Sequence, residues 1–180
     1  GTGSHDTPGS VQRSGFRRRS VLVGGVAAAA VGAVALQGVT GAAPAAAAGR
    51  DLDPHDKDIA FAGVVEIANR IAAGEFTARQ ITDFFLARID MLNPTLRAWT
   101  IPLHERARAE ADALDAKKAS GARLGPLHGV PIGIKAENHV KGVPTTYGGA
   151  AFTTPATDDA EVVKRLRAAG AVILGITAMP

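Results

Sequence analysis

The sequence predicts an α/β fold in which N-terminal helices precede the first part of a mixed, largely parallel sheet with flanking helices. Two short apolar runs, 130–134 and 171–176, have the length and the Gly/Pro boundaries of buried strands. A helical pattern at 158–170 lies between them. Strand, crossover helix and strand in this order form a βαβ unit, in which the two strands pair in parallel.

Charge and composition divide the 180-residue chain into residues 1–49 and residues 50–180. The first segment holds four arginines and one aspartate, which accounts for the whole formal net charge of +3. Residues 50–180 carry equal numbers of basic and acidic side chains and few aromatic ones. They therefore lack the basic surface that nucleic-acid binding requires. The chain has no cysteine, which excludes disulfides, thiolate metal sites and a cysteine nucleophile within it.

Residues 1–49 have the layout of a cleaved export signal. They contain the run FRRRSVL, and no charged side chain follows it within the segment. A cationic stretch, a modestly apolar stretch and small residues for cleavage, here near Ala46 and Ala48, are typical of signal peptides. The pair Arg18 and Arg19, followed by Ser-Val-Leu, resembles a twin-arginine export signal.

A permanent transmembrane anchor is the alternative, because the uncharged stretch is long enough to span a bilayer. Alanine and glycine are weakly hydrophobic, however, and the most apolar part runs only from Val21 to about Leu36. We therefore expect a signal that is cleaved near residue 48. It would bring the protein into transient contact with the membrane and, through the twin-arginine export machinery, to the periplasm or the medium.

Two helices are expected at the start of the body, after a polar arm at 50–58. Apolar residues recur with helical spacing through 64–71, and Gly74 ends this first helix. The second begins at Thr77, which forms a capping box with Gln80, and stops at Asn93-Pro94.

A strand and a further helix follow, before the βαβ unit. Residues 98–101 are a short strand candidate, in which Trp99 is expected to be buried. From about His104 to Lys118 the chain is rich in alanine and in charges of alternating sign, which is typical of a surface helix.

The helix of the βαβ unit is expected to be capped by Asp158 or Asp159 and to end at Gly170. Its apolar face is predicted to comprise Val162, Val163, Leu166 and Ala169.

Two sequence blocks identify a family. Residues 125–152 read GPLHGVPIGIKAENHVKGVPTTYGGAAF, and residues 158–180 read DDAEVVKRLRAAGAVILGITAMP. The first resembles the amidase signature family, whose members carry P-L-x-G-[IV]-P-[IV]-x-[ILV]-K and then G-x-P-T-T. The second resembles that family's next block, which leads to a G-x-T-x-M-P turn. The resemblance covers about Ala60 to Pro180 and implies the amidase signature fold, incomplete in this chain.

The resemblance also implies an activity, in which Lys135 is the catalytic residue. Family members hydrolyse amide C–N bonds, here of a small-molecule or peptide substrate, without a cofactor or metal. The lysine takes a proton through a bridging serine that activates a nucleophilic serine, and backbone N–H groups stabilise the oxyanion. Without the motif, a lysine directly after an apolar strand would be expected to extend its ammonium into water.

Neither family serine is expected within this chain, because both belong to a Gly/Ser-rich segment downstream of the second block. Four of the chain's serines lie in the first 49 residues, and Ser120 lies in a linker. We therefore expect residues 50–180 to be the N-terminal part of an amidase domain that is truncated before the catalytic serines, and to be inactive alone.

The blocks depart from the family pattern next to the lysine. Ala136 and Glu137 stand where the family most often has Asp-Asn. Substrate-binding residues therefore stay unassigned. His128 and His139 are expected to be turn or surface residues rather than metal ligands, because no carboxylate completes a metal site around them.

The two threonines of the G-x-P-T-T motif, Thr145 and Thr146, are expected to stabilise the turn through bonds between their hydroxyls and the backbone.

Two other functions remain open at this point. The A-type chain of a glutamyl-tRNA amidotransferase shares the fold and the lysine but works in the cytosol with partner chains, against which the N-terminal segment argues. A non-catalytic amidase-like module is the other. The presence of both serines in the downstream sequence would decide between an enzyme and such a module.

Overall fold

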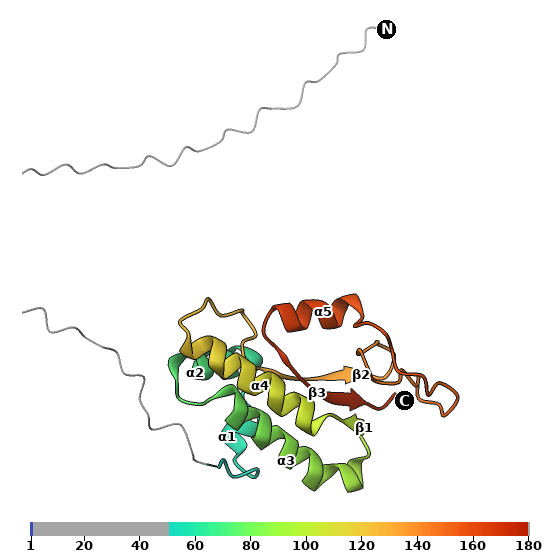
Figure 1. The fold of residues 1–180 in the computed structure, drawn as a ribbon, viewed down its shortest axis with the longest axis horizontal. Helices are drawn as coiled ribbons and strands as arrows, with labels where there is room; N and C mark the ends of the chain where they lie inside the picture. The colour runs from blue at the N-terminus through green and yellow to red at the C-terminus, as the bar shows by residue number, and fades with distance from the viewer. Residues whose placement is uncertain (2–50, 180) are drawn as a thin grey trace, which may run out of the picture. The chain divides into compact units, whose positions relative to one another are not determined.

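The structure, a computed structural model, describes Gly1 and residues 51–179. Apart from Gly1, the predicted export signal therefore lies outside the described residues. The described body has a sheet at its centre and helices on both faces of the sheet (Figure 1).

Three strands form the sheet of the described body: β1 (Trp99–Pro102), β2 (Pro131–Lys135) and β3 (Val172–Thr177). Strand β3 lies in the middle. It pairs in parallel with β2 and antiparallel with β1, so the sheet is mixed. The βαβ unit and the α/β fold class predicted from the sequence are confirmed.

Both faces of β3 are buried, and a bulge sets which residue faces which helix. Val172 and Leu174 pack against the helices between residues 78 and 119, whereas Ile173 and Ile176 pack on the opposite face. The register skips Leu174 between the pairs Ile132↔Ile173 and Gly133↔Gly175. The extra residue reverses the alternation of side chains, as a β-bulge does.

Five helices surround this sheet within the described residues: α1 (Lys57–Ala60), α2 (Val64–Ala73), α3 (Ala78–Leu96), α4 (His104–Ala119) and α5 (Glu161–Ala168). Helices α3 and α4 cover one face of the sheet, and α5 covers the other (Figure 1). Buried residues of α1 and α2 pack against α3 and the entry to β2. Helix α1 was not predicted; the side chain of Asp56 in the polar arm accepts hydrogen bonds from the amides of Asp58 and Ile59 and starts it.

The first two predicted helices are confirmed, with one correction. Helix α2 ends at Gly74, which has a φ of 82°, and α3 begins with the expected capping box of Thr77 and Gln80. The predicted stop at Asn93-Pro94 is wrong, because α3 includes Pro94 and continues to Leu96.

The side chain of Asn93 explains how α3 continues through the proline. It accepts a hydrogen bond from the Trp99 amide at 2.8 Å and donates one to the Trp99 carbonyl at 2.9 Å. Arg97, in the left-handed conformation, donates its amide hydrogen to the Asn93 carbonyl at 2.8 Å. Proline removes one helical donor, but its φ fits a helix, and these bonds stabilise the last turn.

Helix α4 agrees with the prediction to within one residue. It is more than a surface helix, because Ala107 and Ala111 are fully buried against β3. Alanine at these positions allows a close approach of the helix to the sheet.

The expected caps of α5 are wrong. The helix begins after Ala160, which provides no side-chain cap. Asp159 instead accepts a hydrogen bond from the amide of Lys141 and pairs with Arg167. Val163 is fully buried as predicted, but Val162 is 47% exposed and does not belong to the apolar face.

Two burial predictions also need correction. Strand β2 is half exposed rather than buried, because it lies at the edge of the described sheet, and within it only Ile134 is buried. Trp99 is half-buried for the same reason, since β1 forms the other edge. No helix within residues 51–179 combines the length and the apolar character that crossing a bilayer requires.

We expect Gly175→Ala to destabilise the sheet. A Cβ atom at this residue, where φ is +155°, would lie 2.5 Å from the carbonyl oxygen of Ile101 and 2.8 Å from the Cα of Pro102. The clash is relieved only if β1 and β3 separate, so urea unfolding should show a free energy of unfolding lower by about 2–4 kcal/mol. The control is Gly121→Ala, where φ is +74° but nothing lies within 4 Å; it should cost about 1 kcal/mol. Equal losses would contradict the steric argument.

Candidate functional site

Lys135 is the last residue of β2, at the end of the parallel strand pair. Its neighbours Ile134 and Ala136 are buried, and the alternation of a strand turns the Lys135 side chain to the other side. The residue lies opposite Thr177 of β3, and the Ala136 amide donates to the Thr177 carbonyl at 3.1 Å. The two sequence blocks of the family pattern therefore meet at this point of the sheet.

The Lys135 side chain is 44% exposed, and its Nζ lies 3.6 Å from Oε1 of Glu137, which is 45% exposed. An ion pair at this exposure contributes little to stability, about 0–1 kcal/mol. The ammonium is therefore held loosely and can exchange its partner for another group.

The loop after Lys135 turns back on the end of β2. The Asn138 amide donates to the Lys135 carbonyl at 3.0 Å, and the Tyr147 amide donates to the Ala136 carbonyl at 3.0 Å. Between these two bonds, residues 139–144 of the loop pair with residues 155–160 through isolated β-bridges and backbone hydrogen bonds. The G-x-P-T-T motif is thereby folded onto the strand that carries Lys135.

Thr145, in this motif, is buried, but its role differs from the expected one. Only 7% of the residue is exposed, and its hydroxyl makes no hydrogen bond within the described part of the chain. The motif turn is stabilised by backbone bonds instead, among them that from the Gly149 amide to the Thr146 carbonyl at 2.8 Å.

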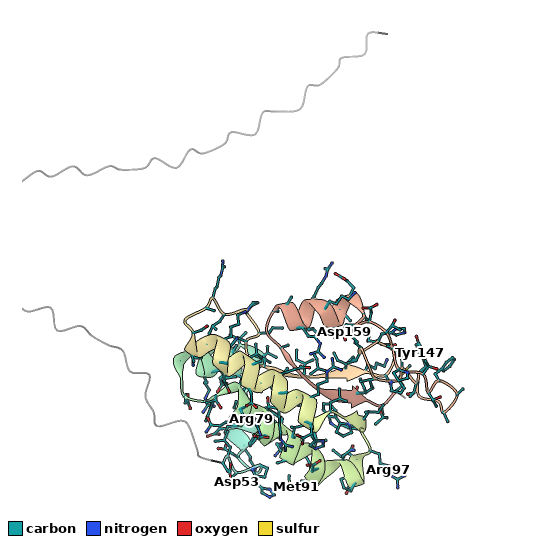
Figure 2. All side chains as sticks on the ribbon, in the orientation of Figure 1. Asp53, Arg79, Met91, Arg97, Tyr147 and Asp159 are labelled. Carbon is teal, nitrogen blue, oxygen red and sulfur yellow. The ribbon has the colours of Figure 1, made fainter. Side chains whose placement is uncertain are left out.

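A cavity of 220 Å³ opens in this loop region. Its walls include Thr145, His139, Tyr147 and Phe152, and the two aromatic rings meet edge to face at 5.6 Å. In Figure 2, Tyr147 lies among the loops at the end of the sheet. Neither aromatic residue was predicted to line a site, although the two are the only aromatic ones after residue 125.

His128 lies in a turn, as predicted, but it is buried there, since only 2% of it is exposed. Backbone bonds hold its segment, since the amides of Leu127 and Gly129 donate to the carbonyls of Ala169 and Gly170, both at 2.9 Å. His139 is exposed, as expected. No cluster of three potential metal ligands occurs within residues 51–179.

Burial lowers the pKa of His128 below its ordinary value, because the imidazolium loses its hydration. Lys117 and Lys118 act in the same direction, whereas Asp115 and the Leu114 backbone oppose it. The imidazole is therefore neutral in the folded protein near pH 7.

A sequence profile of the family described as Amidase matches residues 80–180. The chain is 48% identical over 129 residues to the protein called amidase AmiB2 in Mycobacterium tuberculosis (strain ATCC 25618 / H37Rv), covering 72% of this chain and 27% of that protein. It is 43% identical over 125 residues to the A-type chain of the glutamyl-tRNA(Gln) amidotransferase of Streptomyces coelicolor, covering 68% of this chain and 25% of that protein.

Among solved structures, the chain resembles the native peptide amidase from Stenotrophomonas maltophilia. The TM-score is 0.61 and the sequence identity 36%, over 66% of this chain and 25% of that one. The chain thus spans about a quarter of the length of the curated relatives that it matches.

We expect the free energy of unfolding to decrease as the pH falls below about 6.5, because the unfolded chain then binds a proton at His128 that the folded protein excludes. Chemical unfolding between pH 8 and pH 5 measures this slope. His128→Asn should flatten it, whereas the control His55→Asn, on the exposed arm, should not. An unchanged slope in His128→Asn would refute the assignment.

Proposed function

Because this chain belongs to the amidase family, we propose that the whole protein hydrolyses the carbon–nitrogen bond of a small-molecule or peptide amide. One observation carries the proposal: Lys135 of the first motif block lies at the end of β2, opposite Thr177 of the second block. The amidase names of the relatives and the peptide amidase structure support this reaction class.

In the proposed mechanism, Lys135 acts as a base in its neutral form. It accepts a proton through a bridging serine, which activates a nucleophilic serine to attack the amide carbonyl, and returns the proton to the leaving amine. The two serines would belong to the Gly/Ser-rich segment of the family, downstream of residue 180. The loose pairing of Lys135 with Glu137 supports this role, because the amine is free to change its partner.

The A-type chain of a glutamyl-tRNA amidotransferase is the second candidate, favoured by the 43% identity to the Streptomyces coelicolor protein. The two proposals differ in their partners, because an independent amidase needs none. Hydrolysis of amides by the purified whole protein alone would favour the amidase. Activity that appears only with partner chains would favour the amidotransferase.

We also propose that the protein is exported through the twin-arginine machinery. The support is the run FRRRSVL with its uncharged continuation, which lies outside the described residues.

Replacing both Arg18 and Arg19 by lysine should trap the uncleaved precursor inside the cell, because the export machinery recognises the arginine pair rather than its charge. Immunoblots of cell and export fractions measure this outcome. Replacing Arg13 by lysine is the control and should leave export intact. Normal export of the double variant would exclude this route.

Lys135→Ala in the whole protein should reduce kcat by about 10²–10⁴-fold and change KM little, since it removes the proton acceptor but little contact surface. Lys135→Arg should be nearly as damaging, because a guanidinium stays protonated at every working pH.

The control for this experiment is Lys164→Ala, on the exposed side of α5, which should keep its activity. Near-normal kcat in Lys135→Arg would show that the residue supplies only charge or structure, and the proposed mechanism would fall.

A further inference from the structure

A closed ring of polar contacts joins α4, α5 and the loop that follows Lys135. Arg106 donates to the Lys141 carbonyl at 2.6 Å and pairs with Glu110 at 3.1 Å. Glu110 also pairs with Arg167, which pairs with Asp159 at 3.0 Å. Asp159 accepts a hydrogen bond from the Lys141 amide at 2.7 Å, which closes the ring. We call this set the Lys141 ring.

The ring is balanced in charge and partly shielded from water. Two guanidinium groups face two carboxylates, and the exposed fractions of the Glu110, Arg167 and Asp159 side chains are 20%, 22% and 14%. Charge-assisted bonds in such surroundings are stronger and less screened than surface pairs. The two bonds to the Lys141 backbone lie at the surface, but their partners Arg106 and Asp159 are held in place by these shielded pairs.

The ring is also attached to the sheet. The second carboxylate oxygen of Glu110 accepts a hydrogen bond from the Ile173 amide of β3 at 3.2 Å. Strand β3 pairs with β2 along its length, up to Lys135. Through Glu110, the ring therefore connects the Lys141 backbone to the strand pair that carries the proposed base.

Lys141 lies in the middle of the loop that leaves β2 at Lys135 and returns to it at Tyr147. On its two sides, the Ala160 amide donates to the His139 carbonyl and the Gly142 amide to the Ala156 carbonyl, both at 2.8 Å. These bonds join the loop to residues 156–160, whereas the ring joins it to α4 and β3, so displacement of the loop relative to the sheet must break the ring.

We infer that the Lys141 ring is a positioning device that fixes the loop after Lys135 relative to the sheet, with Arg106 and Asp159 as positioning residues. This inference rests on the proposed amide hydrolysis. A displacement of about 1 Å near reacting groups can cost on the order of 10²-fold in rate. The ring acts through the loop and not through substrate contact, so its loss lowers kcat rather than weakening substrate binding.

Asp159→Asn and Arg106→Ala in the whole protein test the inference. Each should lower kcat by about 10–100-fold with KM within about threefold. Because both hold the backbone of the same residue, Lys141, the double variant should lose little more than the worse single variant. Arg106→Lys, which keeps one donor, should restore part of kcat.

The matched control is Glu161→Gln, which removes an acidic partner of an exposed pair on α5, the helix that carries Arg167 of the ring. Glu161 and Arg165 are 69% and 79% exposed, and their pair lies outside the ring. This variant should retain wild-type kcat and KM. A raised KM with unchanged kcat in the ring variants, or losses no larger than in the control, would overturn the inference.

Hydrogen exchange separates this inference from the proposed function. In Asp159→Asn, amides of residues 136–147 should exchange about tenfold faster, while buried amides of α3 keep their rates. A protein that hydrolyses no amide would refute the proposed function, yet exchange would still test the ring. Unchanged exchange in 136–147, or equal acceleration in α3, would overturn the positioning role.

Discussion

The central strand β3 sets the constraint on which the rest of the structure depends. Both of its faces must be covered by apolar side chains, and the backbone groups along both of its edges must find hydrogen-bond partners. Its residues from Val172 to Ile176 are buried, so each amide and carbonyl needs a partner inside the protein. Strand β2 satisfies one edge, and β1 satisfies the far half of the other. The near half of that edge is completed by Glu110 at the Ile173 amide and by the Leu103 amide at the Leu174 carbonyl.

The pairing of β3 with its neighbours determines which residues come together at the ends of the strands. Parallel strands end on the same side of a sheet, which is where α/β folds place their functional groups. Lys135 therefore emerges beside Thr177, although 42 residues separate them in the sequence. The Glu110 carboxylate, which accepts the hydrogen bond of the buried Ile173 amide, also pairs with Arg106 and Arg167. The need of this one amide for a partner therefore places a charged network next to the loop after Lys135.

Local patterns predicted the features that depend on neighbouring residues. The capping box at Thr77, the glycine end of α2 and the apolar runs of β2 and β3 act within a few residues, and all are found. The features that were wrong or missed depend on distant partners. Asp159 was taken for a helix cap, but it binds Lys141, 18 residues away. The contacts of Arg106 with Lys141 and of Glu110 with Ile173 span 35 and 63 residues, and no periodicity in a single sequence indicates them. His128 lies in a turn as predicted, but its burial was missed for the same reason, since it follows from the return of residues 169–170 to its segment.

Two kinds of ion pair among the described residues fit the two proposed roles. The Glu110 and Asp159 carboxylates are largely shielded, accept backbone amide bonds as well as guanidinium groups, and are thus fixed in one geometry. Lys135 and Glu137 are each nearly half exposed, 3.6 Å apart, and held by a contact that water can replace. A base that accepts a proton and changes its partner, as proposed for Lys135, cannot be fixed in that way, whereas the loop around it gains from being fixed. The division between a shielded ring and a loosely paired lysine is therefore what the proposed role of Lys135 on a preorganised support requires.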